Sequence, residues 1–203
     1  AANPLFRNNG DGSFTKIVCA VGAADVRGSL GVAYADYDQD GWVDLVVGNI
    51  DEGYRLYRNQ LGESSPASWL ALELVGGGAV NRDAVGSRVT VTTPDGKQQL
   101  QEVINGASLG AGNELTLYFG LGTAAQADLR VRWPDGTVQT YQGVKASQRY
   151  RLTYPVEGAG AIQAIATGRA GGEAGVQPAV DLSRLVLLLA AAAVVLLAAV
   201  SMR

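Results

Sequence analysis

Apolar and polar residues alternate in several short runs between residues 69 and 154. A period of two places successive side chains on opposite faces of an extended chain, so each run predicts a strand with one buried face. The apolar members of these runs are Leu70, Leu72 and Leu74; Val89 and Val91; Leu115, Leu117 and Phe119; Leu129, Val131 and Trp133; and Tyr150, Leu152 and Tyr154. Pro-Asp-Gly turns at 94–96 and 134–136 join neighbouring runs as hairpins. This region therefore predicts a small antiparallel β-sandwich or barrel.

The N-terminal part of the chain contains an internal repeat. The run Leu5–Asn8 (LFRN) recurs about 51 residues later as Leu56–Asn59 (LYRN), a period typical of β-propeller blades. Two strand-like apolar runs, 30–34 and 45–48, lie between the copies. Because the pattern stops near Gly62, the first copy is predicted to end a blade whose beginning is missing. The prediction is a partial β-propeller-like repeat.

An uncharged apolar stretch runs from Leu185 to Met202, between Arg184 and Arg203. As a helix, about 18 residues would extend about 27 Å, which is enough to cross the hydrocarbon core of a bilayer. The stretch is apolar all round, which favours a membrane tail over a buried helix of a soluble domain. Small residues and a polar spacer precede it, so a single-pass anchor and a cleaved GPI-type signal both stay open.

Composition narrows the chemistry that the chain can perform. Apolar residues make up 47% and charged residues 17%, so the chain can bury a core and is not wholly disordered. There is no His, which excludes His-dependent catalytic triads and His-ligated zinc or haem. The single Cys, Cys19, excludes an internal disulfide framework. A net charge of −3 gives no footprint for nucleic acid, and the remaining chemistry belongs to carboxylates and hydroxyls.

One acidic loop carries a clear chemical pattern. Between the two strand-like N-terminal runs the chain reads DYDQDGWVD. Carboxylates at alternate positions, with a Gly that permits a sharp bend, let one loop wrap a hard cation, and Ca²⁺ takes six to eight oxygens at about 2.3–2.6 Å. The predicted ligands are Asp36, Asp38, Asp40, the Trp42 carbonyl and Asp44.

Alternatives to a calcium loop on a β scaffold are weaker. An EF-hand needs a bidentate Glu at the twelfth position, where this chain has Val47, and it needs helical flanks. Mg²⁺ demands tight octahedral geometry and keeps its waters. A solvated turn is the remaining alternative, but carboxylates packed this densely repel one another without a cation.

Two sets of segments resemble known domain families. The first set reads NPLFRNNGDGSF, GVAYADYDQDGWVDLVVGN and YRLYRNQ. It resembles the FG-GAP/VCBS repeats of integrin-type β-propellers, which bind calcium in such loops. The second set reads NRDAVGSRVTV, GKQQLQEVINGAS, LYFGLG and DLRVRWPDGTVQTYQGV. It resembles the ASPIC/UnbV domain that follows such repeats in the cartilage acidic protein family and in many bacterial secreted proteins. The resemblance covers about residues 3 to 154 and implies an extracellular, calcium-binding, adhesive or scaffolding protein.

Patterns that suggest an enzyme are poorly supported. The run from Gly106 to Gly110 matches G-x-S-x-G, but no base is available and no helical pattern follows, so a turn is expected. Gly76–Gly78 lacks the context of a phosphate loop. Trp69 and Trp133 could line a sugar-binding face, although aromatics in alternating strands are more often core residues. Nothing positive indicates a two-carboxylate glycosidase.

The predicted organisation has four parts: 1–64, the repeat with its calcium loop; 66–155, the ASPIC/UnbV-like β domain; 156–183, a Gly/Ala-rich flexible stalk; and 184–203, the C-terminal helix. The chain opens at Ala1 with no leader, which predicts a removed signal segment or a longer parent protein. The predicted function is a non-enzymatic, extracellular or periplasmic calcium-binding adhesion or scaffold module. It is held at a membrane by its tail and binds a protein or glycan partner at the cell surface. The alternatives are an accessory subunit of a membrane complex, and a glycan-binding protein or hydrolase that uses surface carboxylates.

Overall fold

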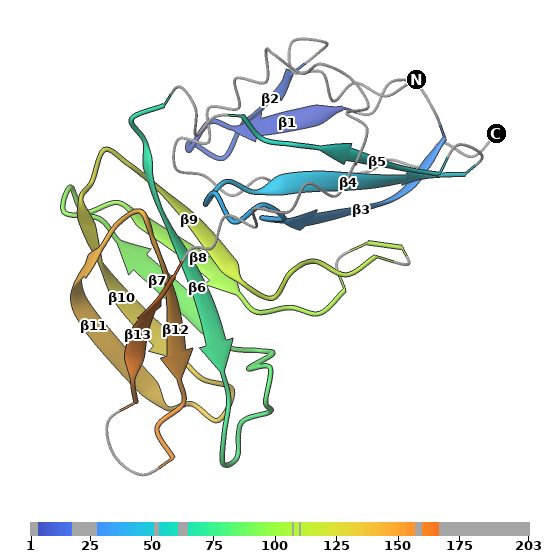
Figure 1. The fold of residues 1–203 in the computed structure, drawn as a ribbon. Coiled ribbons are helices and arrows are strands. Elements are labelled where there is room, and N and C mark those ends of the chain that lie inside the picture. Colours follow the sequence, from blue (N-terminus) through green and yellow to red (C-terminus); the bar gives the residue numbers. More distant parts are fainter. Residues whose placement is uncertain are drawn as a thin grey trace. The chain divides into compact units, whose positions relative to one another are not determined.

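The computed structural model of the chain describes residues 4–17, 28–50, 53–60, 65–106, 108–109, 111–156 and 160–166 (Figure 1). Strands dominate these ranges, which confirms the mainly β prediction. Within them no helix is long and apolar enough to cross a membrane. The C-terminal helix predicted at 184–203 lies outside the described residues. The chain divides into two compact units, which comprise 1–65, 106–113 and 169–203, and 66–105 and 114–168.

The first unit contains two small antiparallel sheets. Its three-stranded sheet has the order β3-β4-β5, built from β3 (Ser29–Ala35), β4 (Asp44–Asn49) and β5 (Gly53–Tyr57) (Figure 1). A separate hairpin joins β1 (Leu5–Asn8) to β2 (Phe14–Ile17). The two apolar runs expected as strands between the repeats are β3 and β4. The described strands give one small sheet and a hairpin, and a propeller stays a prediction.

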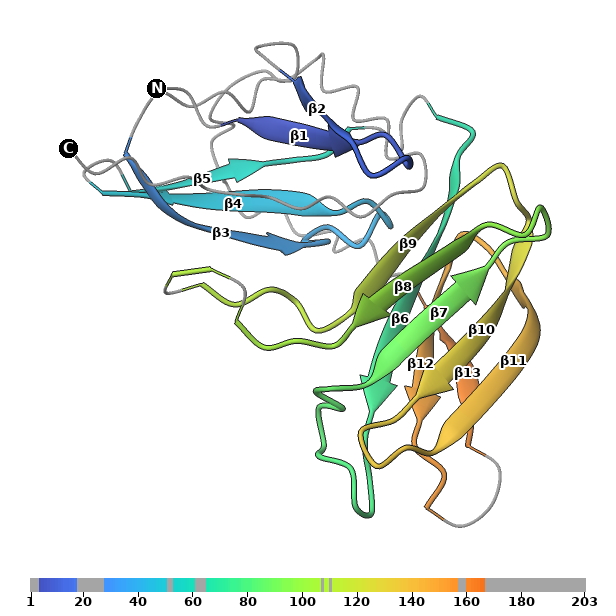
Figure 2. The same ribbon diagram turned by 180° about the vertical axis from the view of Figure 1, so that it is seen from behind.

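The second unit is a sandwich of two four-stranded sheets, in the orders β11-β10-β7-β8 and β13-β12-β6-β9 (Figure 2). Its strands are β6 (Ser68–Val75), β7 (Arg88–Thr92), β8 (Gln98–Glu102), β9 (Leu117–Gly122), β10 (Gln126–Arg132), β11 (Val138–Lys145), β12 (Gln148–Thr153) and β13 (Ile162–Ile165). The two Pro-Asp-Gly turns form hairpins as predicted, but they join β7 to β8 and β10 to β11, and neither β8 nor β11 is among the alternating runs named from the sequence.

Two features of the sandwich differ from the sequence prediction. The sheets are not wholly antiparallel, because β12 pairs with β6 in parallel, from Gln148 opposite Leu70 to Thr153 opposite Val75. Alternation sets the buried face of a strand but not the direction of a neighbour far away in sequence. In addition, β13 pairs with β12, although its residues fall within the predicted stalk. Its Gly- and Ala-rich surroundings resemble a linker in composition, while pairing with β12 satisfies its backbone groups.

The core of the second unit is apolar and contains residues of both sheets. Alternating residues of β6, β7, β9, β10 and β12 point inward, together with residues of β11 and the connecting loops. The largest fully buried side chains of this core are Trp133, Phe119, Leu70, Leu72, Leu129, Leu152, Val89, Val91, Val103 and Val131. Burying a large apolar side chain contributes about 1.5–3 kcal/mol, so this unit holds a sizeable apolar core of its own.

A segment between β8 and β9 belongs to the first unit. Ser108 and Asn113 of this segment contact β3, which is an edge strand of its sheet. The backbone N–H of Val32 donates to Ser108 Oγ at 3.2 Å, and that of Tyr34 donates to Asn113 Oδ1 at 3.1 Å. Free edge groups of a sheet invite pairing with other chains, so these side chains cover part of an exposed edge. The expected turn is present as an isolated bridge between Ser108 and Ala111.

Candidate metal centre

The acidic loop connects β3 to β4. Ala35 at the end of β3 pairs with Asp44 at the start of β4, so the loop leaves and re-enters the sheet at one place. Asp36 follows β3 directly and is 7% exposed, while Asp44 is 2% exposed. Gly41 has a φ of 92°, a left-handed conformation that favours glycine, and it makes the bend that the sequence predicted.

Backbone amides of the loop orient its carboxylates. Asp36 accepts hydrogen bonds from the N–H of Asp40 at 3.0 Å and of Gly41 at 2.9 Å. The N–H of Trp42 donates to Asp40 Oδ1 at 2.9 Å, and the Trp42 side chain is buried. These bonds curl the loop so that its acidic side chains converge.

Three of the predicted ligands are brought together. One carboxylate oxygen from each of Asp36, Asp38 and Asp40 lies within 4.8 Å of the others. Oxygens that ligate one Ca²⁺ at about 2.3–2.6 Å can be no more than about 5 Å apart, so this spacing fits a single ion. Asp38 Oδ1 is buried and has no hydrogen-bond partner. A buried carboxylate oxygen without a donor is costly, and a cation in the cluster would satisfy it.

Asp44 stands apart from this group. Its Oδ2 accepts from the N–H of Tyr37 at 3.2 Å, and its Oδ1 accepts from the N–H of Asn59 at 2.7 Å. Asn59 is itself 2% exposed and donates through Nδ2 to the Val43 carbonyl at 3.2 Å. Asp44 therefore ties the base of the loop to the residues that follow β5.

The electrostatics of the loop oppose ionisation of its buried carboxyls. Burial raises the pKa of Asp36 to about 6 and that of Asp44 to about 7, and the neighbouring carboxylates act in the same direction. Hydrogen bonds from backbone amides offset part of this increase. The loop concentrates negative charge where water cannot solvate it fully. A bound divalent cation would offset the free-energy cost of ionising these carboxyls.

Arg58 and Asn59 were missed by the sequence analysis. Arg58 Nε donates to Asp38 Oδ2 at 2.8 Å, and its Nη2 lies 3.6 Å from Asp40 Oδ2. The hydrogen bond that Arg58 donates to Asp38 is the largest cause of the raised pKa of Arg58. Both residues belong to the LYRN copy of the repeat, so the recurrence of Arg and Asn in this motif was the sequence signal that could have identified them. Its Arg and Asn hold the acidic loop from the neighbouring strand end.

Comparison with known proteins assigns both parts of the chain. Residues 1–47 match the family described as FG-GAP-like repeat, and residues 77–159 match ASPIC and UnbV. The chain is therefore similar to an FG-GAP-like repeat over residues 1–47 and to an ASPIC/UnbV domain over residues 77–159. This confirms the resemblance recognised in the sequence.

Curated relatives of the chain include cartilage acidic protein 1 from Xenopus tropicalis, with 46% identity over 56 residues, and from Homo sapiens, with 45% identity over 56 residues. The matched region is 27% of this chain but only 9% and 8% of those proteins, so the similarity spans a small part of their length. A solved structure of a candidate cell adhesion protein from Bacteroides uniformis covers 82% of this chain and 99% of its own, with 8% identity and a TM-score of 0.31.

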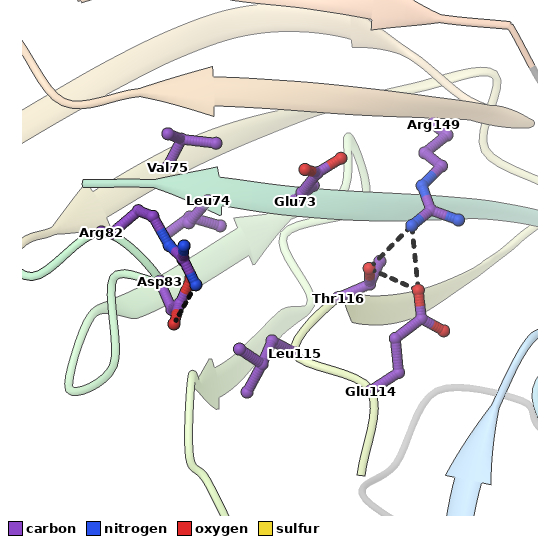
Figure 3. A pocket seen from close by; sticks show the side chains of 9 residues that line it. All are labelled: Glu73, Leu74, Val75, Arg82, Asp83, Glu114, Leu115, Thr116 and Arg149. Carbon is purple, nitrogen blue, oxygen red and sulfur yellow. Dashed lines mark hydrogen bonds and ion pairs between the residues drawn. The ribbon is translucent and has the colours of Figure 1, made fainter. Parts of the chain in front are cut away.

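The ASPIC/UnbV domain has a pocket of about 400 Å³ lined by charged and apolar side chains (Figure 3). Arg149 donates to Glu114 Oε1 at 2.9 Å and to Thr116 Oγ1 at 3.0 Å. Arg82 pairs with Asp83, its neighbour in sequence, at 2.9 Å. These cations are matched by carboxylates, and the pocket presents no activated nucleophile. It therefore offers a weaker candidate site than the acidic loop of the FG-GAP-like repeat.

The Gly106–Gly110 motif also fails as a catalytic site. Its serine, Ser108, accepts a hydrogen bond from the N–H of Val32 and is half-buried along β3. The chain contains no His that could act as its base. The serine positions a backbone segment.

Proposed function

We propose that the chain is a calcium-stabilised, non-enzymatic adhesion or scaffold module that works outside the cell and is held at a membrane by its C-terminal segment. The pairing of an FG-GAP-like repeat with an ASPIC/UnbV domain, and the similarity to cartilage acidic protein 1, fit an extracellular adhesion-type module. Calcium binding, the membrane anchor, and a protein or glycan partner at the cell surface are the further steps of this proposal.

The observation that carries the proposal is the buried, unpartnered Asp38 Oδ1 within a cluster of three carboxylates. Asp36, Asp38 and Asp40 would hold the ion, with the Trp42 carbonyl and Asp44 completing or supporting the site. Oxygen-only donors of this charge suit Ca²⁺. The ion would be structural. It would fix the β3–β4 loop and, through Arg58 and Asn59, the end of β5.

Thermal unfolding of the full chain with Ca²⁺, with Mg²⁺ and with a chelator tests this role. At a hundredfold excess over Kd, one bound ion stabilises a fold by about 2.7 kcal/mol, which is a shift of several degrees. The shift should disappear in the double variant Asp38→Asn and Asp40→Asn.

A matched control removes two carboxylates elsewhere. Asp95→Asn and Asp135→Asn change exposed turn residues of the ASPIC/UnbV domain and should leave the calcium shift intact. A folded chain whose unfolding ignores Ca²⁺, or a shift that survives loss of Asp38 and Asp40, contradicts the assignment.

A second candidate, an accessory subunit of a larger complex, is favoured by exposed apolar residues on the three-stranded sheet. Val46 and Leu56 pair in register and are 36% and 38% exposed, and Tyr54 on β5 is 85% exposed. A partner surface could cover these side chains. Light scattering of the full chain separates the two ideas, because an accessory subunit should self-associate when isolated, whereas an independent module should stay monomeric.

A further inference from the structure

Three arginines lie on the outer face of the sheet β11-β10-β7-β8, whose strands are labelled in Figure 2. Arg130 and Arg132 are two residues apart on β10, so they point to the same face, about 7 Å from each other. Arg132 lies directly opposite Arg88 of β7 in the strand register. All three side chains are exposed, and the inward-facing neighbours of the β10 pair, Leu129 and Val131, are buried.

The charges of these arginines are only partly neutralised. Arg88 Nε bonds Glu102 Oε2 at 2.7 Å. Among the described residues, Arg130 and Arg132 have no ion pair. Asp128, the acidic residue on the same face of β10, instead accepts a hydrogen bond from the N–H of Gly143 at 2.8 Å.

On the other sheet of the same domain, the arginines of β12 are paired with carboxylates. Arg149 pairs with Glu114 at 2.9 Å, and Arg151 pairs with Glu73 at 3.0 Å. These two residues are also two apart on one strand, β12. The domain therefore matches each arginine with a carboxylate on one outer face and leaves two unmatched on the other.

Such an arrangement costs free energy in the isolated protein. Like charges placed directly opposite each other on a sheet repel and destabilise it. Sequences that break a local rule of this kind do so mainly at functional sites. A guanidinium binds sulfate, phosphate and carboxylate groups in a bidentate manner. An anionic ligand bound between these residues would therefore neutralise their mutual repulsion and be attracted by both.

The surroundings of the arginines favour a polymer over a small ion. They lie on an open sheet, and Thr90 and Thr140 flank Arg130 in the strand register. A flat face with hydroxyls and spaced cations can contact a repeating chain of anionic groups along its length. Peptide recognition usually relies on pockets for individual side chains rather than on spaced cations of this kind.

We propose that this cationic face, formed by Arg88, Arg130 and Arg132, binds a sulfated polysaccharide. The choice of an extracellular polysaccharide rests on the proposed location of the module, but the cationic face does not depend on the calcium loop. The proposal adds a partner of defined chemistry to the adhesion function and places its contact in the ASPIC/UnbV domain.

Heparin-affinity chromatography of the full chain, in buffered Ca²⁺ and over a range of salt concentrations, tests the proposal. The double variant Arg130→Gln and Arg132→Gln should elute at lower salt than the unmodified chain. Binding to a polyanion releases about one counterion per contacting cation, so the slope of log affinity against log salt should fall by about two. The variant Arg130→Lys and Arg132→Lys keeps the charge and should retain most of the salt dependence.

Matched controls make the result decisive. Arg7→Gln and Lys16→Gln remove the same charge from exposed positions of the first unit and should leave retention unchanged. Equal losses in both double variants, or no retention of the unmodified chain, overturn the proposal. Dextran sulfate should compete while uncharged dextran does not, and stronger competition by polyglutamate would assign the face to acidic peptides instead. Retention that persists in the Asp38→Asn and Asp40→Asn variant separates this face from the calcium site.

Discussion

The two units of the chain are stabilised in different ways. In the ASPIC/UnbV domain, seventeen buried apolar residues of the part that the structure describes, from both sheets and their connecting loops, form one cluster. In the FG-GAP-like unit, the best-buried polar groups are the carboxyls of Asp36 and Asp44 and the amide of Asn59, beside a few buried apolar residues such as Trp42 and Tyr57. Apolar burial stabilises the first arrangement without any ligand, since it follows the area removed from water.

Buried carboxyls behave in the opposite way. Taking an ionised group out of water costs free energy unless it is paired, and the raised pKa values of Asp36 and Asp44 express that cost. Arg58 supplies one positive charge to the loop, which contains four Asp residues. Apolar burial therefore stabilises the ASPIC/UnbV domain without a ligand, while the FG-GAP-like unit is expected to gain stability from an ion.

Deleting a core side chain should give the largest effect. Phe119 is 1% exposed between the two sheets of the sandwich. Phe119→Ala should destabilise the ASPIC/UnbV domain by about 3–5 kcal/mol, because the lost contacts leave a cavity. Urea unfolding followed by tryptophan fluorescence measures the loss, and Phe119→Leu should cost much less. Calcium binding should survive, and its disappearance would show that the loop depends on the sandwich.

Five strands of the sandwich, β6, β7, β9, β10 and β12, were predictable because apolar and polar residues alternate along them. Alternation at Leu70–Leu74 and Leu129–Trp133 places one face of each strand in the core, and Pro-Asp-Gly turns fix local reversals. The parallel pairing of β12 with β6 was not predictable in this way. It joins Gln148 to Leu70, far apart in sequence, and no local pattern specifies such a partner.

Only the local part of the candidate site was predictable from the sequence. Spacing alone places Asp36, Asp38 and Asp40 in one loop, because their chemistry is local. Arg58 reaches Asp38 from 20 residues away, so its role depends on how β5 returns beside the loop. The repeat of the LFRN motif as LYRN was visible, but a repeated Arg and Asn do not by themselves say what they bind.

Changing pH should sharpen the contrast between the two units. The pKa values of Asp36 (about 6) and Asp44 (about 7) lie above the ordinary 3.8, so the folded state holds more protons than the unfolded state between those values. Without calcium, the stability that these two carboxyls contribute is therefore fully present below their ordinary pKa of 3.8, falls as the pH rises, and is lost above about 6 to 7.

Calcium should counteract this loss of stability at higher pH. The ion binds the ionised carboxylates, so at pH 7.5 it should restore about 2.7 kcal/mol at a hundredfold excess over Kd, and less at pH 5. Thermal unfolding at the two pH values, with chelator and with Ca²⁺, measures both trends. Apo stability that rises with pH would contradict the assigned cost of burying these carboxyls.

A methyl group at Gly31 should have an intermediate effect. A Cβ there would sit 2.7 Å from the Leu109 carbonyl oxygen, so Gly31→Ala must push the 106–113 segment away from β3. We expect a loss of about 1–3 kcal/mol, as for other overpacked sites. Hydrogen exchange should show reduced protection of the Val32 and Tyr34 amides, which bond to that segment.

Gly48 provides the matched control for this substitution. It pairs with Gly31 in the sheet, but its added Cβ would meet the side chain of Tyr54 at 3.3 Å. Tyr54 is 85% exposed and free to move, so Gly48→Ala should cost less and leave both amides protected. Equal effects of the two variants would mean that the segment does not hold the edge of β3.

The smallest change in stability is expected for a substitution at Glu102. This substitution also allows the heparin retention of the two outer faces of the sandwich to be compared. Glu102→Gln breaks an exposed ion pair with Arg88 and should cost less than about 1 kcal/mol. It frees a third guanidinium beside Arg132, so heparin retention should increase and the salt slope should steepen by about one. Glu73→Gln frees Arg151 on the opposite face, away from other unmatched cations, and should leave retention unchanged. An equal increase in both variants would mean that retention follows total charge, whereas an increase only for Glu102→Gln requires the local arrangement of Arg88, Arg130 and Arg132.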